Sequence, residues 1–250
     1  MLNRMTRSMA TLSGGLLALG LLGATTAGAA DATTGNQPYA GYQTANTGWH
    51  FRYVQADFTV PLSACKNDDF TLAGVALIGS ANNVAVGVTC LNGQVWAGYE
   101  VGYTGTTDPH QFTHVVAVAA NDTYQATIYY DQGNNYDSLQ LNNLTTGQSG
   151  VINDTHSAHG AMYSQAITVG GVANPPADAC NSTTPGNSFI LTPFSHAGAT
   201  AYNGQHGGGL SGPWGSANQL TENNGAQTIA AAPLLYGGGT TFNVREYCNA

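Results

Sequence analysis

Charged side chains are scarce in this sequence. Only 7% of its 250 residues are charged, and five lysines and arginines stand against thirteen acids. A chain so poor in cations lacks the basic patches that bind nucleic acid or anionic membranes, so we exclude both as partners. The low charge does not indicate disorder, because 42% of the residues are hydrophobic and thirteen are tyrosines, enough to fill a core.

Long hydrophobic runs are also missing, apart from Leu12–Leu22 near the N-terminus. This run follows Arg4 and Arg7, precedes the small residues Ala27-Gly28-Ala29, and is too short to span a membrane. We therefore predict a signal peptide over residues 1–30 and a single secreted, extracellular domain over residues 31–250; a retained N-terminal anchor is the alternative. Loss of Arg4 and Arg7 changes the formal charge from −8 to −10.

Cysteine is rare, and its spacing does not fit a metal site. Four cysteines in an oxidising compartment allow three disulfide pairings, of which we favour the first with the second and the third with the fourth. These are Cys65, Cys90, Cys180 and Cys248. Because no CxxC pair or Cys/His zinc pattern occurs, we expect neither a metal nor a cofactor.

The common catalytic motifs are absent: the chain contains no GxSxG, no HExxH and no phosphate-binding loop. Two histidine pairs could bind a metal, His110 with His114 and His156 with His159. Neither has a third ligand in a recognisable pattern, so solvated imidazoles are the simpler interpretation.

The periodicity of the mature chain is that of β-strands, with no capped helical segment. Short strands separated by Gly/Asn turns predict an all-β fold, an antiparallel β-sandwich (jelly-roll or concanavalin-like) of two curved sheets, which we expect to be monomeric. The predicted strands cover residues 49–60, 70–78, 84–90, 95–103, 114–120, 124–131, 136–144, 162–172, 188–192, 228–232 and 240–247. The Pro-rich segment 174–186 and the Gly-rich segment 203–215 are predicted loops.

The clearest local signal is Asn92-Gly93, which predicts a two-residue hairpin turn between two alternating runs. The turn sets the register of the strands, with Leu91 opposite Gln94 and Ala85 opposite Glu100. One face is then a valine-rich core face. The other carries very small residues together with one indole and one carboxylate: Ala85, Gly87, Thr89, Trp96, Gly98 and Glu100.

This small-residue face has two interpretations. Glycine in a strand allows the close approach of a ligand or of another layer of the protein. In the first case Gly87, Thr89, Trp96, Gly98 and Glu100 line a concave cleft that binds a polysaccharide or a peptide, through ring stacking and polar contacts. In the second, a neighbouring loop covers the face.

The order of the strands and several short stretches resemble the glutamic peptidases, the eqolisins. Residues 121–148, which end in Leu-Thr-Thr-Gly-Gln, are similar to two strands and a turn of that family, and residues 96–103 (WAGYEVGY) to its acidic aromatic strand. The resemblance implies a secreted β-sandwich and acid endopeptidase chemistry, in which a glutamate activates water and a glutamine positions it.

The chain departs from the family at both of these positions. Gly87 stands where the resemblance places the glutamine, and Val169 where it places the glutamate. Of the cleft acids only Glu100 is retained, a weak catalytic candidate. We therefore predict a glutamic-peptidase-like pseudoenzyme. The alternative is an active acid endopeptidase that uses Gln94 or Gln165 with Glu100.

A second hydrolytic alternative is glycoside cleavage, which needs two carboxyl groups at about 5–10 Å. Glu100 could be one of them. Its possible partners are Asp108, Glu222 and Glu246.

The scarcity of charge also predicts acid tolerance. Few carboxylates can be paired in the fold, so few native interactions are lost when carboxylates are protonated. We expect no cooperative unfolding above about pH 4 when circular dichroism is followed during acid titration. A cooperative transition at higher pH would contradict this prediction.

Overall fold

The computed structural model describes residues 34–37, 40–45, 50–60, 71–80, 82–91, 94–103, 106–111, 118–155, 163–172, 191–201, 206–212, 217–224, 227–232, 235–237 and 239–246. Every regular element in these ranges is a β-strand, which confirms the all-β prediction. No helix in the described ranges could cross a membrane. The predicted signal peptide lies outside them.

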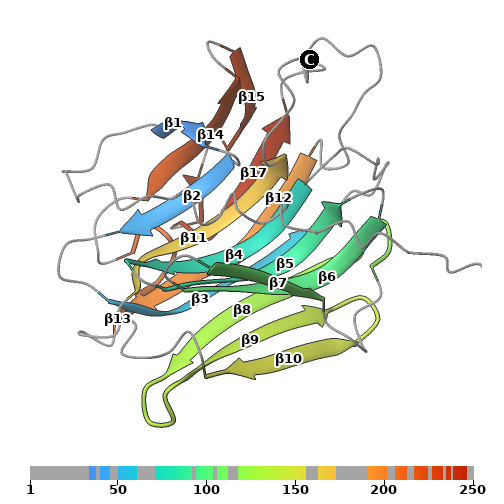
Figure 1. The fold of residues 1–250 in the computed structure, drawn as a ribbon. Coiled ribbons are helices and arrows are strands. Elements are labelled where there is room, and N and C mark those ends of the chain that lie inside the picture. The colour runs from blue at the N-terminus through green and yellow to red at the C-terminus, as the bar shows by residue number, and fades with distance from the viewer. Residues whose placement is uncertain are drawn as a thin grey trace, which may run out of the picture.

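The strands form two layers, seen in Figure 1. The first, sheet I, has the order β1-β14-β2-β11-β4-β5-β6-β7 and is antiparallel except for the pair β1–β14. Its strands are Thr34–Gln37 (β1), Asn218–Asn224 (β14), Ala40–Ala45 (β2), Tyr163–Val172 (β11), Thr71–Gly79 (β4), Asn82–Leu91 (β5), Gln94–Tyr103 (β6) and Thr106–Gln111 (β7).

The second layer, sheet II, is antiparallel with the order β10-β9-β8-β3-β12-β17. Three short strands join its margin: β13 pairs with β12, β16 with β17, and β15 with both β14 and β17, so that it connects the sheets. The bounds are Ser149–Asp154 (β10), Tyr136–Asn143 (β9), Thr123–Asp131 (β8), Phe51–Thr59 (β3), Leu191–Ala201 (β12), Thr241–Glu246 (β17), His206–Gly208 (β13), Gln227–Ala231 (β15) and Leu235–Tyr236 (β16).

Aromatic side chains connect the two layers inside the sandwich. Tyr42 of sheet I contacts Phe242 edge-on, with ring centroids 5.1 Å apart. Phe242 stacks on Phe194 at 4.7 Å, Phe194 packs on Phe58 at 5.6 Å, and Phe58 stacks on Tyr124 at 5.9 Å. All five are buried. This aromatic chain crosses β17, β12, β3 and β8, and burial of such large rings contributes strongly to folding.

The register predicted for the central hairpin is confirmed. Leu91 pairs with Gln94, Gly87 with Gly98 and Ala85 with Glu100. The valine-rich face, including Val84 and Val86, lies in the core. The turn that the resemblance placed at the end of residues 121–148 is present over residues 144–146, and further turns lie at 120–121 and 132–135, with Asn121, Asn135 and Gly147 at positive φ.

Several strands differ from the prediction. The described end of the segment predicted at residues 114–120 is a loop and a turn, not a strand. The strand predicted at 188–192 continues within the described residues to Ala201, because a bulge between Ser195 and Gly198 lets it pass His196. The strand pattern alone gave no sign of β1, β2, β7, β10, β13, β14 and β16.

Candidate functional site

The small-residue face of sheet I lies opposite its core face. Two rows of register partners cross it. One row contains Gly41, Val169, Gly74, Gly87, Gly98 and Gln111. The next contains Gln43, Ile167, Ala76, Ala85, Glu100 and Pro109. Of these, Gln43, Ile167, Ala76, Ala85 and Glu100 are buried, so the face is covered in the structure rather than open to water.

Gly74 and Gly87 of the first row allow the backbones of β4 and β5 to approach each other closely. A Cβ on Gly87 would lie 2.2 Å from the carbonyl oxygen of Ala73, and a Cβ on Gly74 would lie 2.3 Å from that of Val86. Both distances are far below a van der Waals contact, and both neighbours are backbone atoms that cannot rotate away. The position where the resemblance places the catalytic glutamine therefore has no space for any side chain.

Gly87 and Val169, the two positions that the resemblance assigns to catalysis, share one row with Gly74 between them. Two strand spacings separate them, about 10 Å. Both positions belong to one row of the sheet, but the Gly87 position has no space for a side chain. The side chain of Val169 lies outside the described part of the chain.

Glu100 is the unusual polar group on this face. It is 2% exposed, and neither carboxyl oxygen has a hydrogen-bond partner among the described residues. Burial raises the pKa of Glu100 to about 8, from an ordinary value of 4.5, because removal from water penalises the charged form. Below pH 8 the group is therefore mainly a neutral carboxylic acid, which both donates and accepts a hydrogen bond.

The glutamines proposed as alternatives lie far from Glu100. Gln165 is on β11, three strand spacings or about 14 Å away across the sheet. Gln94 is six residues along β6, about 20 Å away. Gln43 shares the row of Glu100 at four spacings, about 19 Å. None of these backbone positions allows a shared water molecule.

A different glutamine is closer. Gln111 pairs with Gly98 and is therefore a diagonal neighbour of Glu100 on the same face, about 7–8 Å away between Cα atoms. The sequence did not single it out, because no strand was predicted at residues 106–111. Proline is accepted at this position because the only described pairing of β7 is with β6, which makes it the last strand of sheet I within the described residues.

The carboxylates considered for glycoside cleavage are not brought together with Glu100. Asp108 pairs with Val101, so it belongs to the opposite face. Glu222 is on β14, five strand spacings or about 24 Å from β6. Glu246 is on β17 in the other sheet.

Several predicted site residues lie outside what the structure describes. Trp96 pairs with Thr89 as predicted, but their side chains are not described. The same holds for the four cysteine side chains and for the side chain of His110, while His114, His156 and His159 are not described at all. Among the described residues, no group of three His, Cys, Asp or Glu side chains could hold a metal.

Comparison with known proteins identifies the fold. No family model and no curated protein matches the sequence. Two crystal structures of Scytalido-glutamic peptidase, with a peptide-based transition state analog and with a transition state analog inhibitor, each superpose with a TM-score of 0.60 at 18% and 16% identity. SCP-B of the eqolisin family, in complex with the tripeptide Ala-Ile-His, gives a TM-score of 0.54 at 14% identity. Each match covers 84% of this chain and 98% of the other. The chain therefore has a glutamic-peptidase-like fold, as the resemblance implied.

The raised pKa of Glu100 predicts how stability depends on pH. Between pH 4.5 and about 8 the unfolded chain releases this proton while the folded chain keeps it, so stability falls as pH rises through that interval. The interval corresponds to about 5 kcal/mol. Glu100→Gln should remove most of the decline when urea unfolding is measured at pH 4.5, 6 and 8.

Asp131→Asn at the β8–β9 turn is the control for this experiment. Hydrogen bonds from Asn134 lower the pKa of Asp131, so its titration lies below the tested interval and the decline should persist. If the stability of the Glu100→Gln variant declines with rising pH as steeply as that of the wild type, Glu100 is ionised in the folded protein.

The backbone contact between β4 and β5 predicts that Gly87 cannot be replaced. Gly87→Ala and Gly87→Gln should each lose about 3 kcal/mol of stability, since a strand must shift to admit the Cβ. Thermal unfolding should show a fall in Tm of roughly 6–12 °C. Gly133→Ala is the matched control, because its Cβ would meet only the side chain of Asp131, at 3.3 Å. A Gly87→Gln protein as stable as the wild type would show that the site accepts a catalytic side chain.

Proposed function

We propose that this protein is a secreted, non-catalytic binding protein of glutamic-peptidase-like fold, which holds an extended peptide against the small-residue face of sheet I. The neutral carboxyl group of Glu100 is the central contact. It offers one donor and one acceptor, the same set that a peptide backbone amide needs.

The observation that carries this proposal is the state of Glu100. A buried polar group without a partner costs free energy, and no described residue relieves that cost. A ligand that hydrogen-bonds to the carboxyl group would recover it. The similar structures hold a peptide-based analog and a tripeptide, which supports a peptide over a polysaccharide. Because Glu100 is buried, a ligand can reach it only after a rearrangement of the protein, and association should be slow.

Two features support the absence of catalysis. A general base must be ionised, yet Glu100 with a pKa of about 8 is protonated throughout the acid range. The contact at Gly87 also excludes a glutamine side chain at the family position. The remaining catalytic alternative is Glu100 with Gln111, and it is tested below.

The direct test is equilibrium dialysis of a mixture of blocked decapeptides, with retained peptides quantified by mass spectrometry. At pH 5 the wild type should retain peptides, and Glu100→Ala should retain at least tenfold less. Glu100→Gln should bind nearly as well, because an amide also donates and accepts. Trp96→Ala should bind weakly without loss of folding.

The pH dependence separates this proposal from a merely structural role of Glu100. Retention by the wild type should fall several-fold at pH 9, where the carboxyl group is ionised, while retention by Glu100→Gln should not change. No retained peptide, or retention that Glu100→Ala leaves intact, would refute the proposal.

Proteolysis assays at about pH 2–5 test the catalytic alternative. The proposal predicts cleavage of denatured protein no faster than background. Cleavage that disappears in both Glu100→Gln and Gln111→Ala would instead identify an acid endopeptidase with a relocated pair.

A further inference from the structure

The outward face of sheet II carries a continuous line of hydrogen-bonded side chains. His196, Asp57, Gln125, Asn142 and Ser149, here called the polar row, come from β12, β3, β8, β9 and β10 respectively. Asp57, Gln125, Asn142 and Ser149 are successive register partners. The row therefore crosses five strands, about 19 Å.

Each neighbour in the polar row is bonded to the next. His196 Nδ1 lies 2.8 Å from Asp57 Oδ2, and Gln125 Nε2 donates to Asp57 Oδ1 at 3.0 Å. Asn142 Nδ2 donates to Gln125 Oε1 at 3.4 Å, and Ser149 Oγ donates to Asn142 Oδ1 at 2.6 Å. Hydrogen bonds between two side chains are a small fraction of those in proteins. An unbroken series of them on an outer face therefore indicates side chains that are fixed before a ligand binds.

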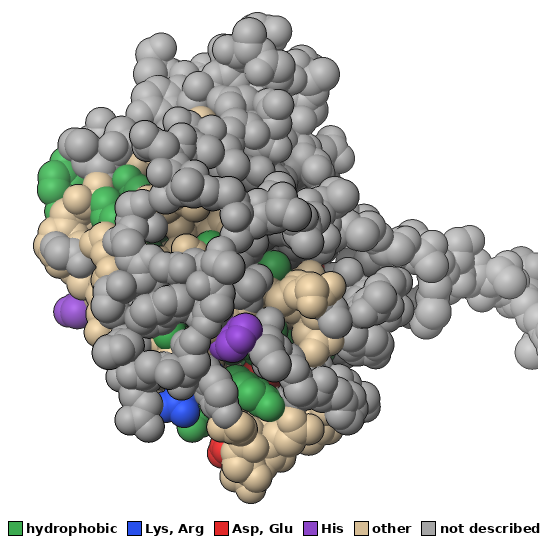
Figure 2. Space-filling view, turned by 90° about the vertical axis from the view of Figure 1, so that its left-hand side faces the viewer, with side chains coloured by type: hydrophobic (Ala, Val, Ile, Leu, Met, Phe, Trp, Pro, Cys, Tyr) green, Lys and Arg blue, Asp and Glu red, His purple; other side chains and the backbone are tan. Residues whose placement is uncertain are grey.

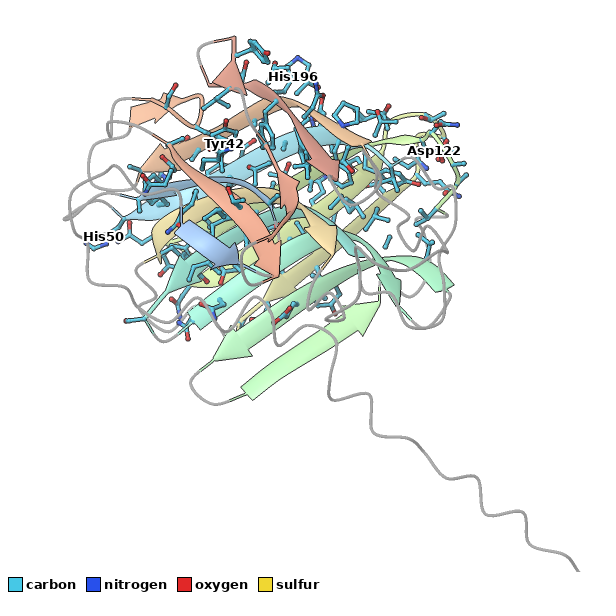
Figure 3. The ribbon with its side chains drawn as sticks, turned by 90° about the horizontal axis from the view of Figure 1, so that it is seen from above. Tyr42, His50, Asp122 and His196 are labelled. Carbon is cyan, nitrogen blue, oxygen red and sulfur yellow. The ribbon has the colours of Figure 1, made fainter. Side chains whose placement is uncertain are left out.

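His196 at the end of the row is held in an unusual conformation. Its φ is 50°, in the left-handed region that few non-glycine residues adopt. Gln55 Nε2 donates to its backbone carbonyl at 3.2 Å, and Asp57 holds its ring. The side chain is 73% exposed, and Figure 3 places it at the periphery of the molecule, away from Tyr42 in the interior. Strain of this kind, maintained by the surroundings, is typical of functional positions.

Two tyrosines lie to one side of the polar row, four residues along β3 and β8, or about 13 Å. Tyr53 and Tyr129 are direct register partners on the same face, and Tyr129 is 38% exposed. Tyr53 donates its hydroxyl hydrogen to Gln55 Oε1. Tyrosine rings give a ligand a flat apolar surface at a low cost in side-chain entropy.

The charge of this surface indicates which class of ligand it can bind. Apart from Arg52 in β3, the five strands contain no lysine or arginine, so an anionic polymer finds no counter-charge. Asp57 is already occupied by His196 and Gln125. Charged side chains are sparse among the coloured atoms of Figure 2 as well. What remains is a face of amide and hydroxyl groups beside two rings.

We propose that the polar row with Tyr53 and Tyr129 is a second binding surface, which takes a neutral polysaccharide. Sugar hydroxyls both donate and accept, so they match amides, and the apolar faces of sugar rings match tyrosine. Because the amides are already fixed by one another, binding loses little side-chain entropy. This surface belongs to sheet II and is independent of the peptide site on sheet I.

Depletion of the protein from solution by insoluble cellulose, chitin and β-1,3-glucan tests the inference at pH 7. The wild type should bind at least one of the three, and bind immobilised polygalacturonate, an anionic polymer, at least tenfold more weakly. Tyr129→Ala and Gln125→Ala should each weaken binding to the neutral polymer at least tenfold, with unchanged thermal unfolding for Tyr129→Ala.

Tyr236→Ala is the matched control, since Tyr236 is 52% exposed but belongs to β16. It should bind like the wild type, and so should Glu100→Ala, which separates this surface from the peptide site. Failure to bind any of the three neutral polymers overturns the inference. So does a loss of binding in Tyr236→Ala or Glu100→Ala that equals the loss in Tyr129→Ala.

Discussion

The removal of Glu100 from water constrains both the function and the pH behaviour of this protein. A carboxyl group at 2% exposure without a described partner is stable only as the neutral acid. Its register partner Ala85 provides no polar side-chain atom that could stabilise a charge. The same surroundings that make Glu100 unsuitable as a general base make it suitable as a neutral hydrogen-bonding group.

The outward faces of the two sheets differ in their side chains. On sheet I, Gly74 and Gly87 bring two backbones so close that side chains are excluded, and the face is covered. On sheet II, the outward residues are long amides that bond to one another across the strands. The aromatic chain from Tyr42 to Tyr124 holds the layers together between these faces.

The sequence predicted the parts of the fold that local chemistry determines. Asn92-Gly93 alone set the register of β5 and β6, because a two-residue turn leaves no freedom in pairing. Strands with polar or irregular sequences were missed. No strand was predicted at β7, and the strand pattern alone gave only the first residues of β12, because the bulge at His196 interrupts its alternation. Their pairing is decided by neighbouring strands, not by their own periodicity.

For the candidate site, the sequence placed Glu100 on a face of small residues, and the structure agrees. The sequence could not show that the carboxyl group is buried, since burial depends on what packs across the sheet. Nor could it show that Gly87 touches the backbone of β4, because that contact joins separate strands. The polar row was missed for the same reason: its members come from five strands, and only the register aligns them.

The pH of greatest stability follows from two carboxyl groups that titrate in opposite senses. Asp131 has a lowered pKa, so the stability that it contributes is lost only as pH falls below its ordinary value of 3.8. Glu100 has a raised pKa, so its contribution is lost as pH rises above 4.5. Both contributions are present together only between these limits. Because Glu100 is buried and Asp131 is not, water screens the contribution of Asp131 more strongly, and the loss of stability with rising pH is the larger of the two effects.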